Sequence, residues 1–123
     1  MLHHVSLGTN DMARARAFYD PALAVVGLRF LGLQQSLNYG VGGFMVSLTR
    51  PVGGQPASPG NGVHVAFHAG TRAMVEEFHR VALSHGGSSD GAPGLRPHYA
   101  PNYYAAFVRD PDGNKLEAFT YAA

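Results

Sequence analysis

The sequence predicts an α+β fold in which one βαβββ unit occurs twice. Two observations lead to this prediction. The same order of elements, a strand, a helix and further short strands, is found on both sides of a segment rich in proline and glycine. Residue types also recur in register at an offset of 60 residues: His4 matches His64, Val5 matches Val65, Ala13 matches Ala73, and Phe18 matches Phe78. We therefore expect two modules related by a pseudo-two-fold axis.

The first module is expected over residues 1–49. Alternation of apolar and polar side chains predicts a strand over 2–8. Asn10 and Asp11 are good N-cap residues, and the "MARARAFY" that follows them favours a helix. Three short apolar or aromatic pieces then predict consecutive antiparallel strands: "LRFLGL" (28–33), "SLNYGV" (36–41) and "FMVSL" (44–48).

The second module, residues 63–123, repeats this order. It begins with a strand over 63–69, and Thr71 is the expected N-cap of a helix that stops at Gly86-Gly87. The glycine-rich region after the helix can hold one weak strand. The tight-turn sequence "DPDG" is flanked by the last two strands, 102–109 and 114–121.

The composition suits one soluble domain and excludes several classes of function. A chain of 123 residues can bury one core, and the three prolines and four glycines of residues 50–62 predict a linker between the modules. A net charge of +1 with scattered basic residues argues against nucleic acid or a membrane as partner. Without cysteine there is no thiolate chemistry. Neither an export signal nor a membrane-spanning run is encoded, so we expect a cytoplasmic protein.

Strand alternation selects three candidate metal ligands. His3 and His4 are adjacent and should point to opposite faces of a strand. The face of His3 is apolar and suits helix packing, so His4 is expected on the open face, as is His64 in the repeat. Glu117 alternates with apolar neighbours and belongs on the same kind of face, where Ser47 matches it in the first module.

Two imidazoles and one carboxylate that converge can hold a divalent metal ion and leave coordination positions open for substrate. The pseudo-two-fold axis would bring the two histidines together. The alternative is that each is an ordinary polar residue of a half-buried sheet.

The segments "HHVSLGTNDMARARAFYDPAL", "NGVHVAFHA" and "YYAAFVRDPDGNKLEAF" resemble the vicinal oxygen chelate superfamily, which includes glyoxalase I, bleomycin resistance proteins and extradiol dioxygenases. The resemblance covers essentially the whole chain. It implies paired βαβββ modules with curved mixed or antiparallel sheets that enclose a cleft, helices outside, and metal ligands at His4, His64 and Glu117. It also implies a homodimer, with the site built within one chain or across two.

The sequence departs from known members at three places. Ser47 stands where glyoxalase I has a glutamate that ligates the metal and takes part in proton transfer, so a true glyoxalase I is not expected. Phe107 stands where fosfomycin resistance enzymes have a tyrosine. Ala100, in "PHYAPNYY", stands where short relatives often have a histidine.

Five residues are candidates for contact with a substrate. Strand alternation puts Tyr103 and Phe107 on the same face. If Phe107 faces the cleft, Tyr103 faces it too and is placed to hydrogen-bond a substrate and to take part in catalysis. His98 can reach in as an acid or base. Met45 and Ser47 are expected on the opposite wall. The alternatives are a structural tyrosine and an exposed loop histidine.

The preferred hypothesis is an enzyme of lyase, isomerase or dioxygenase type, in which Fe²⁺, Mn²⁺, Zn²⁺ or Ni²⁺ acts as a Lewis acid on a small substrate that chelates through neighbouring oxygens. The alternative is a metal-free protein of the bleomycin-resistance type that sequesters an antibiotic or a metabolite. A scaffold without a small-molecule role ranks last.

Overall fold

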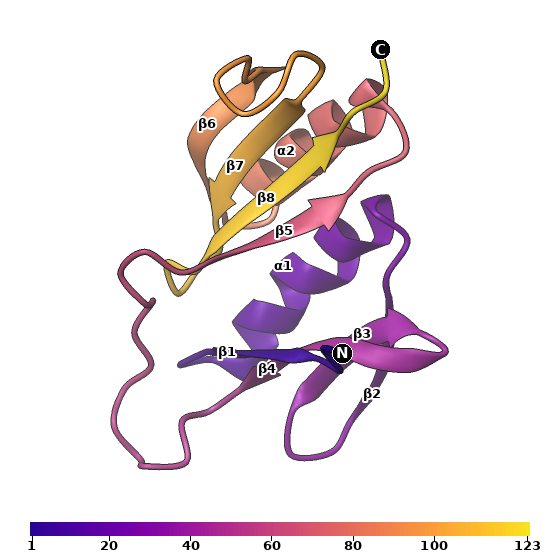
Figure 1. Ribbon diagram of the computed structural model, residues 1–123. Helices are drawn as coiled ribbons and strands as arrows, with labels where there is room; N and C mark the ends of the chain where they lie inside the picture. Colours follow the sequence, from indigo (N-terminus) through magenta and orange to yellow (C-terminus); the bar gives the residue numbers. More distant parts are fainter.

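The computed structural model describes residues 1–123 and has the predicted order of elements (Figure 1). The first module contains β1 (Val5–Gly8), α1 (Met12–Val25), β2 (Arg29–Leu33), β3 (Leu37–Val41) and β4 (Gly43–Thr49). The second contains β5 (His64–His68), α2 (Arg72–Ser84), β6 (Ser88–Leu95), β7 (Tyr104–Arg109) and β8 (Lys115–Thr120). The α+β class and the two βαβββ modules are confirmed. Neither helix has the length and hydrophobicity of a membrane span.

Each module forms its own four-stranded mixed sheet, with strand orders β1-β4-β3-β2 and β5-β8-β7-β6. In each sheet the first strand runs parallel to the last, and all other neighbours are antiparallel. The expected weak strand is β6, which pairs with β7 through two shifts of register. No strand of one sheet pairs with a strand of the other, so the two sheets stay separate.

The strand register confirms the match of Ser47 with Glu117. In the first sheet Ser47 lies between Ser6 on β1 and Asn38 on β3. In the second sheet Glu117 lies between Ala66 on β5 and Phe107 on β7. Glu117 therefore occupies in module two the place that Ser47 occupies in module one.

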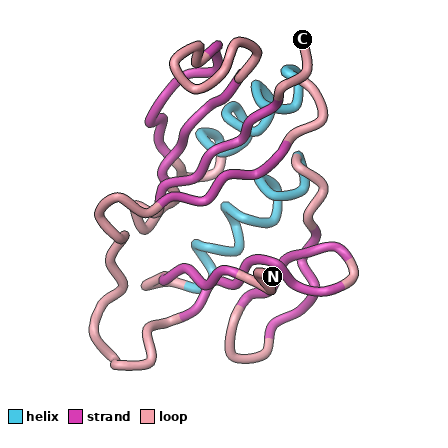
Figure 2. Tube along the Cα trace, in the orientation of Figure 1, coloured by secondary structure: helices cyan, strands magenta, loops and turns pink.

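Both helices begin at the predicted N-caps. The side chain of Asp11 accepts a hydrogen bond from the backbone N–H of Arg14, and that of Thr71 accepts one from Met74. Each helix packs on its own sheet, and the two helices also pack against each other (Figure 2). One cluster of 20 buried residues therefore continues through both modules.

The predicted strand over 2–8 begins late, and the placement of His3 on the helix side is wrong. Pairing starts at Val5, and His3 and His4 are both exposed, with their Nδ1 atoms 2.8 Å apart. Both rings contact Phe44. The reason is a bulge between β3 and β4, where Gly40 pairs with Phe44. A bulge bends its strand, so pairing does not extend to residues 1–4 and strand alternation does not apply there.

The turn between β7 and β8 attaches module two to module one through a buried carboxylate. Asp110 Oδ2 accepts hydrogen bonds from the Tyr19 hydroxyl of α1 at 2.5 Å and from the side-chain amide of Asn114 at 2.9 Å. Its Oδ1 accepts the backbone N–H groups of Asp112 and Asn114 at 2.9 and 2.8 Å. Four donors thus compensate the loss of water around this carboxylate.

A second carboxylate of the same turn reaches the start of α1. Asp112 accepts hydrogen bonds from the Thr9 hydroxyl at 2.5 Å, the Asn10 backbone N–H at 3.0 Å and the Arg14 guanidinium at 2.8 Å. The Asn10 side chain exchanges two hydrogen bonds with the backbone of Ala57 in the linker. We call this set the inter-module junction: Thr9, Asn10, Arg14, Tyr19, Ala57, Asp110, Asp112 and Asn114.

We predict that Asp110→Ala lowers the free energy of unfolding by about 3 kcal/mol, because the buried donors of Tyr19 and Asn114 lose their acceptor. Urea unfolding followed by circular dichroism measures this change. Glu77→Gln is the control, since Glu77 pairs with Arg80 on the surface of α2 and should leave the unfolding midpoint unchanged. Equal stability of the Asp110→Ala variant and the wild type would contradict the role of the junction.

We also predict a loss of stability at alkaline pH that depends on Tyr19. Burial, followed by the neighbouring Asp110 carboxylate, raises the pKa of Tyr19 well above its ordinary value of 10.0. Above pH 10 the unfolded chain releases this proton and the folded chain keeps it, so stability falls with pH by about 1.4 kcal/mol per pH unit from this group. Tyr19→Phe should reduce the slope of unfolding free energy against pH by about 1 kcal/mol per pH unit between pH 10 and 11, where the unfolded tyrosine passes from half to nearly full ionisation. An unchanged slope would contradict the prediction.

Candidate functional site

The open face of the module-two sheet carries a buried carboxylate. Glu117 on β8 is only 2% exposed. Its Oε1 lies 3.0 Å from Nε2 of His64 on β5, and its Oε2 accepts a hydrogen bond from the Tyr103 hydroxyl. His64 and Glu117 come from neighbouring parallel strands, in which Ala66 pairs with Glu117, so His64 reaches the carboxylate diagonally. The structure therefore brings together three of the predicted site residues.

Tyr103 acts as a hydrogen-bond donor to Glu117. Partial burial, and then the hydrogen bond to Glu117, raise the pKa of Tyr103 above its ordinary value of 10.0. The hydroxyl consequently stays protonated at neutral pH. Its ring stacks on Phe119 with a centroid distance of 5.2 Å and an interplanar angle of 4°, and it contacts Tyr99 and Tyr121 edge-on. Tyr103 thus connects a cluster of aromatic side chains to the Glu117 carboxylate.

Phe107 lies on the other side of Glu117, on β7. It pairs with Glu117 in the register, and its ring centroid is 6.2 Å from that of His64. The side chain is 7% exposed because Lys115 and Arg96 lie over it. Phe107 therefore packs beneath two cationic side chains and presents little surface to a ligand.

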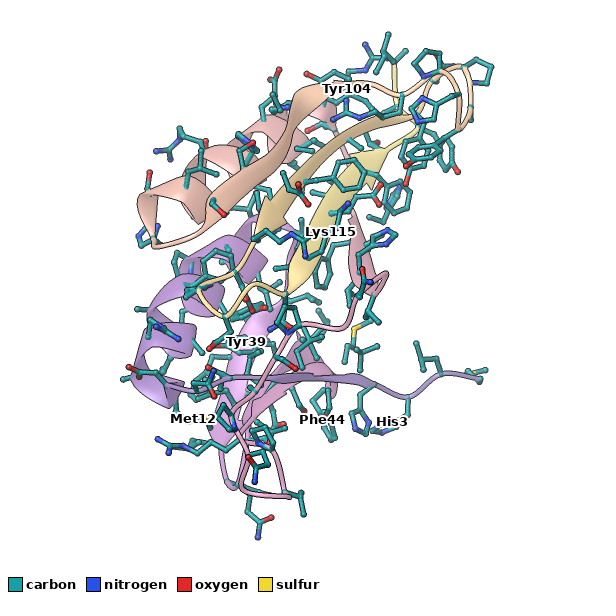
Figure 3. All side chains as sticks on the ribbon, turned by 90° about the vertical axis from the view of Figure 1, so that its left-hand side faces the viewer. His3, Met12, Tyr39, Phe44, Tyr104 and Lys115 are labelled. Atoms are coloured by element: carbon teal, nitrogen blue, oxygen red, sulfur yellow. The ribbon has the colours of Figure 1, made fainter.

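A polar hollow adjoins His64 at the end of the sheet nearest the β7–β8 turn. Its volume is about 460 Å³, and it is lined by residues 59–63, His64, Arg109 and Lys115. Arg109 and Lys115 pair with each other in the register, and His64 pairs with Lys115. Figure 3 shows Lys115 on the module-two sheet.

The open face of module one has the neutral Ser47 in the place of Glu117. A hollow of about 380 Å³ is lined mainly by polar residues, including His4, Ser6, Asn38 and Ser47. The Ser47 hydroxyl is buried and donates to Asn38 Oδ1 at 2.8 Å. His4 contacts the rings of His3 and Phe44 (Figure 3 labels the latter two).

Within one chain, the structure does not bring His4 to His64 and Glu117. The two histidines line different hollows, and no group of three histidine, aspartate or glutamate side chains in the chain could hold a metal ion. His98 is exposed and contacts the ring of Tyr99. Met45 lies away from Ser47 in a small hollow that it shares with residues 66–68 of module two.

Sequence reasoning missed Lys115, Arg109 and Arg96 as members of this face. A signal was present for Lys115, because it is the only lysine of the chain and stands two residues before Glu117 on the same strand. Residues two apart on a strand share a face. Arg96 could not be found in this way, since it follows an irregular strand with two register shifts.

Comparison with known proteins places this geometry in a family. Residues 1–118 match the family model of the Glyoxalase/Bleomycin resistance protein/Dioxygenase superfamily. A glyoxalase/bleomycin resistance protein from Albidiferax ferrireducens T118 is 33% identical, with a TM-score of 0.88 and 98% of both chains covered. A search of curated proteins finds no match.

Two more distant structures share the fold. A glyoxalase-related enzyme from Fulvimarina pelagi is 19% identical, with a TM-score of 0.79 over 98% of this chain and 87% of that one. A lactoylglutathione lyase from Agrobacterium tumefaciens is 22% identical, with a TM-score of 0.68 over 98% and 92%. The family match, together with the two βαβββ modules, establishes that this chain belongs to the glyoxalase/bleomycin resistance protein/dioxygenase superfamily.

Proposed function

We propose that the protein is a metal-dependent enzyme of lyase, isomerase or extradiol-dioxygenase type. It acts on a small substrate that chelates a divalent ion through two neighbouring oxygens. The proposed ligands are His64 and Glu117 of one chain, with His4 as the third. The observation that carries the proposal is the pairing of an exposed imidazole with a buried carboxylate, 3.0 Å apart, on the open face of module two.

The environment of Glu117 fits a cation. Its carboxylate is 2% exposed, yet no lysine or arginine forms an ion pair with it. Its hydrogen-bond partners are the His64 ring and the Tyr103 hydroxyl, which are both weak compensation for a buried negative charge. Imidazole nitrogen and carboxylate oxygen are ligands that Zn²⁺, Fe²⁺, Mn²⁺ and Ni²⁺ accept.

We propose that His4 reaches the site from a second copy of the chain. His4 lies in the exposed segment before β1 and lines the hollow of module one, whereas the His64 and Glu117 pair belongs to module two. The pseudo-two-fold repeat makes His4 the counterpart of His64. A homodimer in which module one of each copy faces module two of the other would form two equal three-ligand sites.

When bound, the ion would supply a Lewis acid for the substrate oxygens. The chain's own residues orient this site. Tyr103 donates to Glu117 and fixes the direction of the carboxylate, in the way that second-sphere groups hold metal ligands. Ser47, the counterpart of Glu117, is neutral and donates to Asn38, so it offers no carboxylate base of the glyoxalase I kind. The exposed His98 has no role in the proposal.

We predict that protein purified without chelator contains close to one equivalent of a divalent metal per chain, measured by elemental mass spectrometry. His64→Ala should lose this metal, because an imidazole ligand is removed. His68→Ala is the matched control: His68 is an exposed histidine of the same strand and should leave the metal content unchanged.

The same metal should stabilise the apoprotein. At about 100 times its dissociation constant it should raise the free energy of unfolding by about 2.7 kcal/mol in the wild type and not in His64→Ala. Negligible metal together with no stabilisation in the wild type would instead indicate a metal-free binding protein of the bleomycin-resistance type.

We also predict that two inactive variants complement each other. His4→Ala and Glu117→Ala should each bind little metal. When equal amounts of the two variants pair at random, half of the dimers are heterodimers. In each heterodimer one site carries both substitutions and the other site is intact, so the mixture should recover about one quarter of the wild-type metal content. Co-refolding of the two variants followed by metal analysis tests this. No recovery would contradict a site shared between chains, and full metal in His4→Ala would exclude His4 as a ligand.

A further inference from the structure

We infer that the hollow next to His64 binds the anionic group, a carboxylate or a phosphate, of the substrate. The hollow is lined by residues 59–63, His64, Arg109 and Lys115 and has a volume of about 460 Å³. The identity of this anion as part of a substrate rests on the proposed function. Its binding does not require the metal, so the two can be tested separately.

Two cations of the hollow share one carboxylate. Nε of Arg109 is 3.0 Å and Nζ of Lys115 is 3.5 Å from the same Oδ2 atom of Asp90. Arg109 also donates to the Gly113 carbonyl at 3.1 Å, whereas Lys115 has no partner other than Asp90 and the ring of Phe107. Arg96, Arg109 and Lys115 carry three positive charges against the two carboxylates of Asp90 and Glu117. The net charge around the hollow is therefore positive, and an anion would neutralise it through charge-assisted hydrogen bonds.

Phe107 orders the cations without removing their charge. Nζ of Lys115 is 5.0 Å and Cζ of Arg96 is 5.4 Å from the centroid of this buried ring. Arg96 is fixed further by hydrogen bonds to the carbonyls of Gly94 and Ala92, both at 2.8 Å. A cation over an aromatic face remains a full positive charge. Cations that are already ordered lose less side-chain entropy when an anion binds.

The fold itself does not require these cations. Lys115 and Arg109 of module two correspond by the repeat to Met45 and Gly40 of module one, which are uncharged. The same scaffold is therefore built without them in module one. At these two register positions the charges occur only in the module that carries His64 and Glu117, as expected for residues that select a substrate.

The spacing along β8 defines the class of substrate. Lys115 and Glu117 share a face and are two residues apart, which is about 7 Å along a strand. A molecule that spans this interval has its anionic group a few bonds from its chelating oxygens. Hydroxy acids, oxo acids and phosphate monoesters of small oxygenated molecules meet this condition.

The test uses the full chain after removal of metal with a chelator. Inorganic phosphate and acetate are titrated at constant ionic strength, and backbone amide shifts are followed by nuclear magnetic resonance. We expect saturable shifts in residues 59–64 and 109–115 with at least one of the two anions, and the tighter one indicates whether the substrate is a phosphate or a carboxylate. Lys115→Met should weaken binding about ten-fold, because one charge-assisted contact is lost.

Two variants control for loss of charge and for folding. Arg16→Met removes a cation that also lies over a phenylalanine ring and pairs with one aspartate, but in module one, and it should leave anion binding unchanged. Lys115→Arg keeps the charge and should retain binding. Absence of saturable shifts in the wild type, or equal affinity in Lys115→Met, would overturn the inference whatever the metal content of the protein.

A second measurement needs no variant. Because Lys115 is the only lysine, its acetylation by an activated ester can be followed by peptide mass spectrometry in the wild type. Saturating anion should slow acetylation of Lys115 at least five-fold and leave the α-amino group unaffected. Equal rates with and without anion would count against binding at this hollow.

Discussion

The structure depends most on the buried Asp110 carboxylate and the four hydrogen bonds that it accepts. Asp110 directly follows β7 in the turn before β8, and it accepts a hydrogen bond from Tyr19 in the middle of α1. This single group therefore fixes the β7–β8 turn of one module against the helix of the other. The turn is flanked by Arg109 at the end of β7 and by Lys115 and Glu117 on β8. The attachment of the modules therefore also sets the position of the candidate site.

The two modules have kept one scaffold and diverged in chemistry. At the central position of the open face, module one has a neutral Ser47 hydroxyl bonded to Asn38, and module two has the Glu117 carboxylate beside Phe107. Two residues earlier on the strand, module one has Met45 where module two has Lys115. Because strand register fixes the place of each side chain, such replacements change the charge of a face without changing the fold. Module two consequently holds the candidate site, and module one has a neutral serine at the corresponding position.

Prediction from sequence succeeded where the chain is regular. Alternation within a paired strand and the offset of 60 residues were enough to place His64 and Glu117 on one face, and Asp11 and Thr71 were recognised as N-caps because capping is a local interaction. Prediction failed for His3, because the bulge between β3 and β4 limits the pairing of β1 with β4 to residues from Val5 onward. Strand alternation therefore does not apply to His3. The cationic hollow was missed, since Asp90 lies on an irregular strand and Arg96 follows it, and the sequence does not specify the register of that strand.

The sequence by itself determined the two βαβββ modules, the N-caps of their helices and the face on which each regular strand residue lies, because these follow from local propensity and from a period of two. Only the tertiary structure decided that the DPDG turn is an inter-module attachment, that Tyr103 and His64 meet at Glu117, and that His4 stays apart from them within one chain. These outcomes depend on how one module packs against the other. The free energy of that packing comes from contacts between residues up to about a hundred positions apart, which no local pattern encodes.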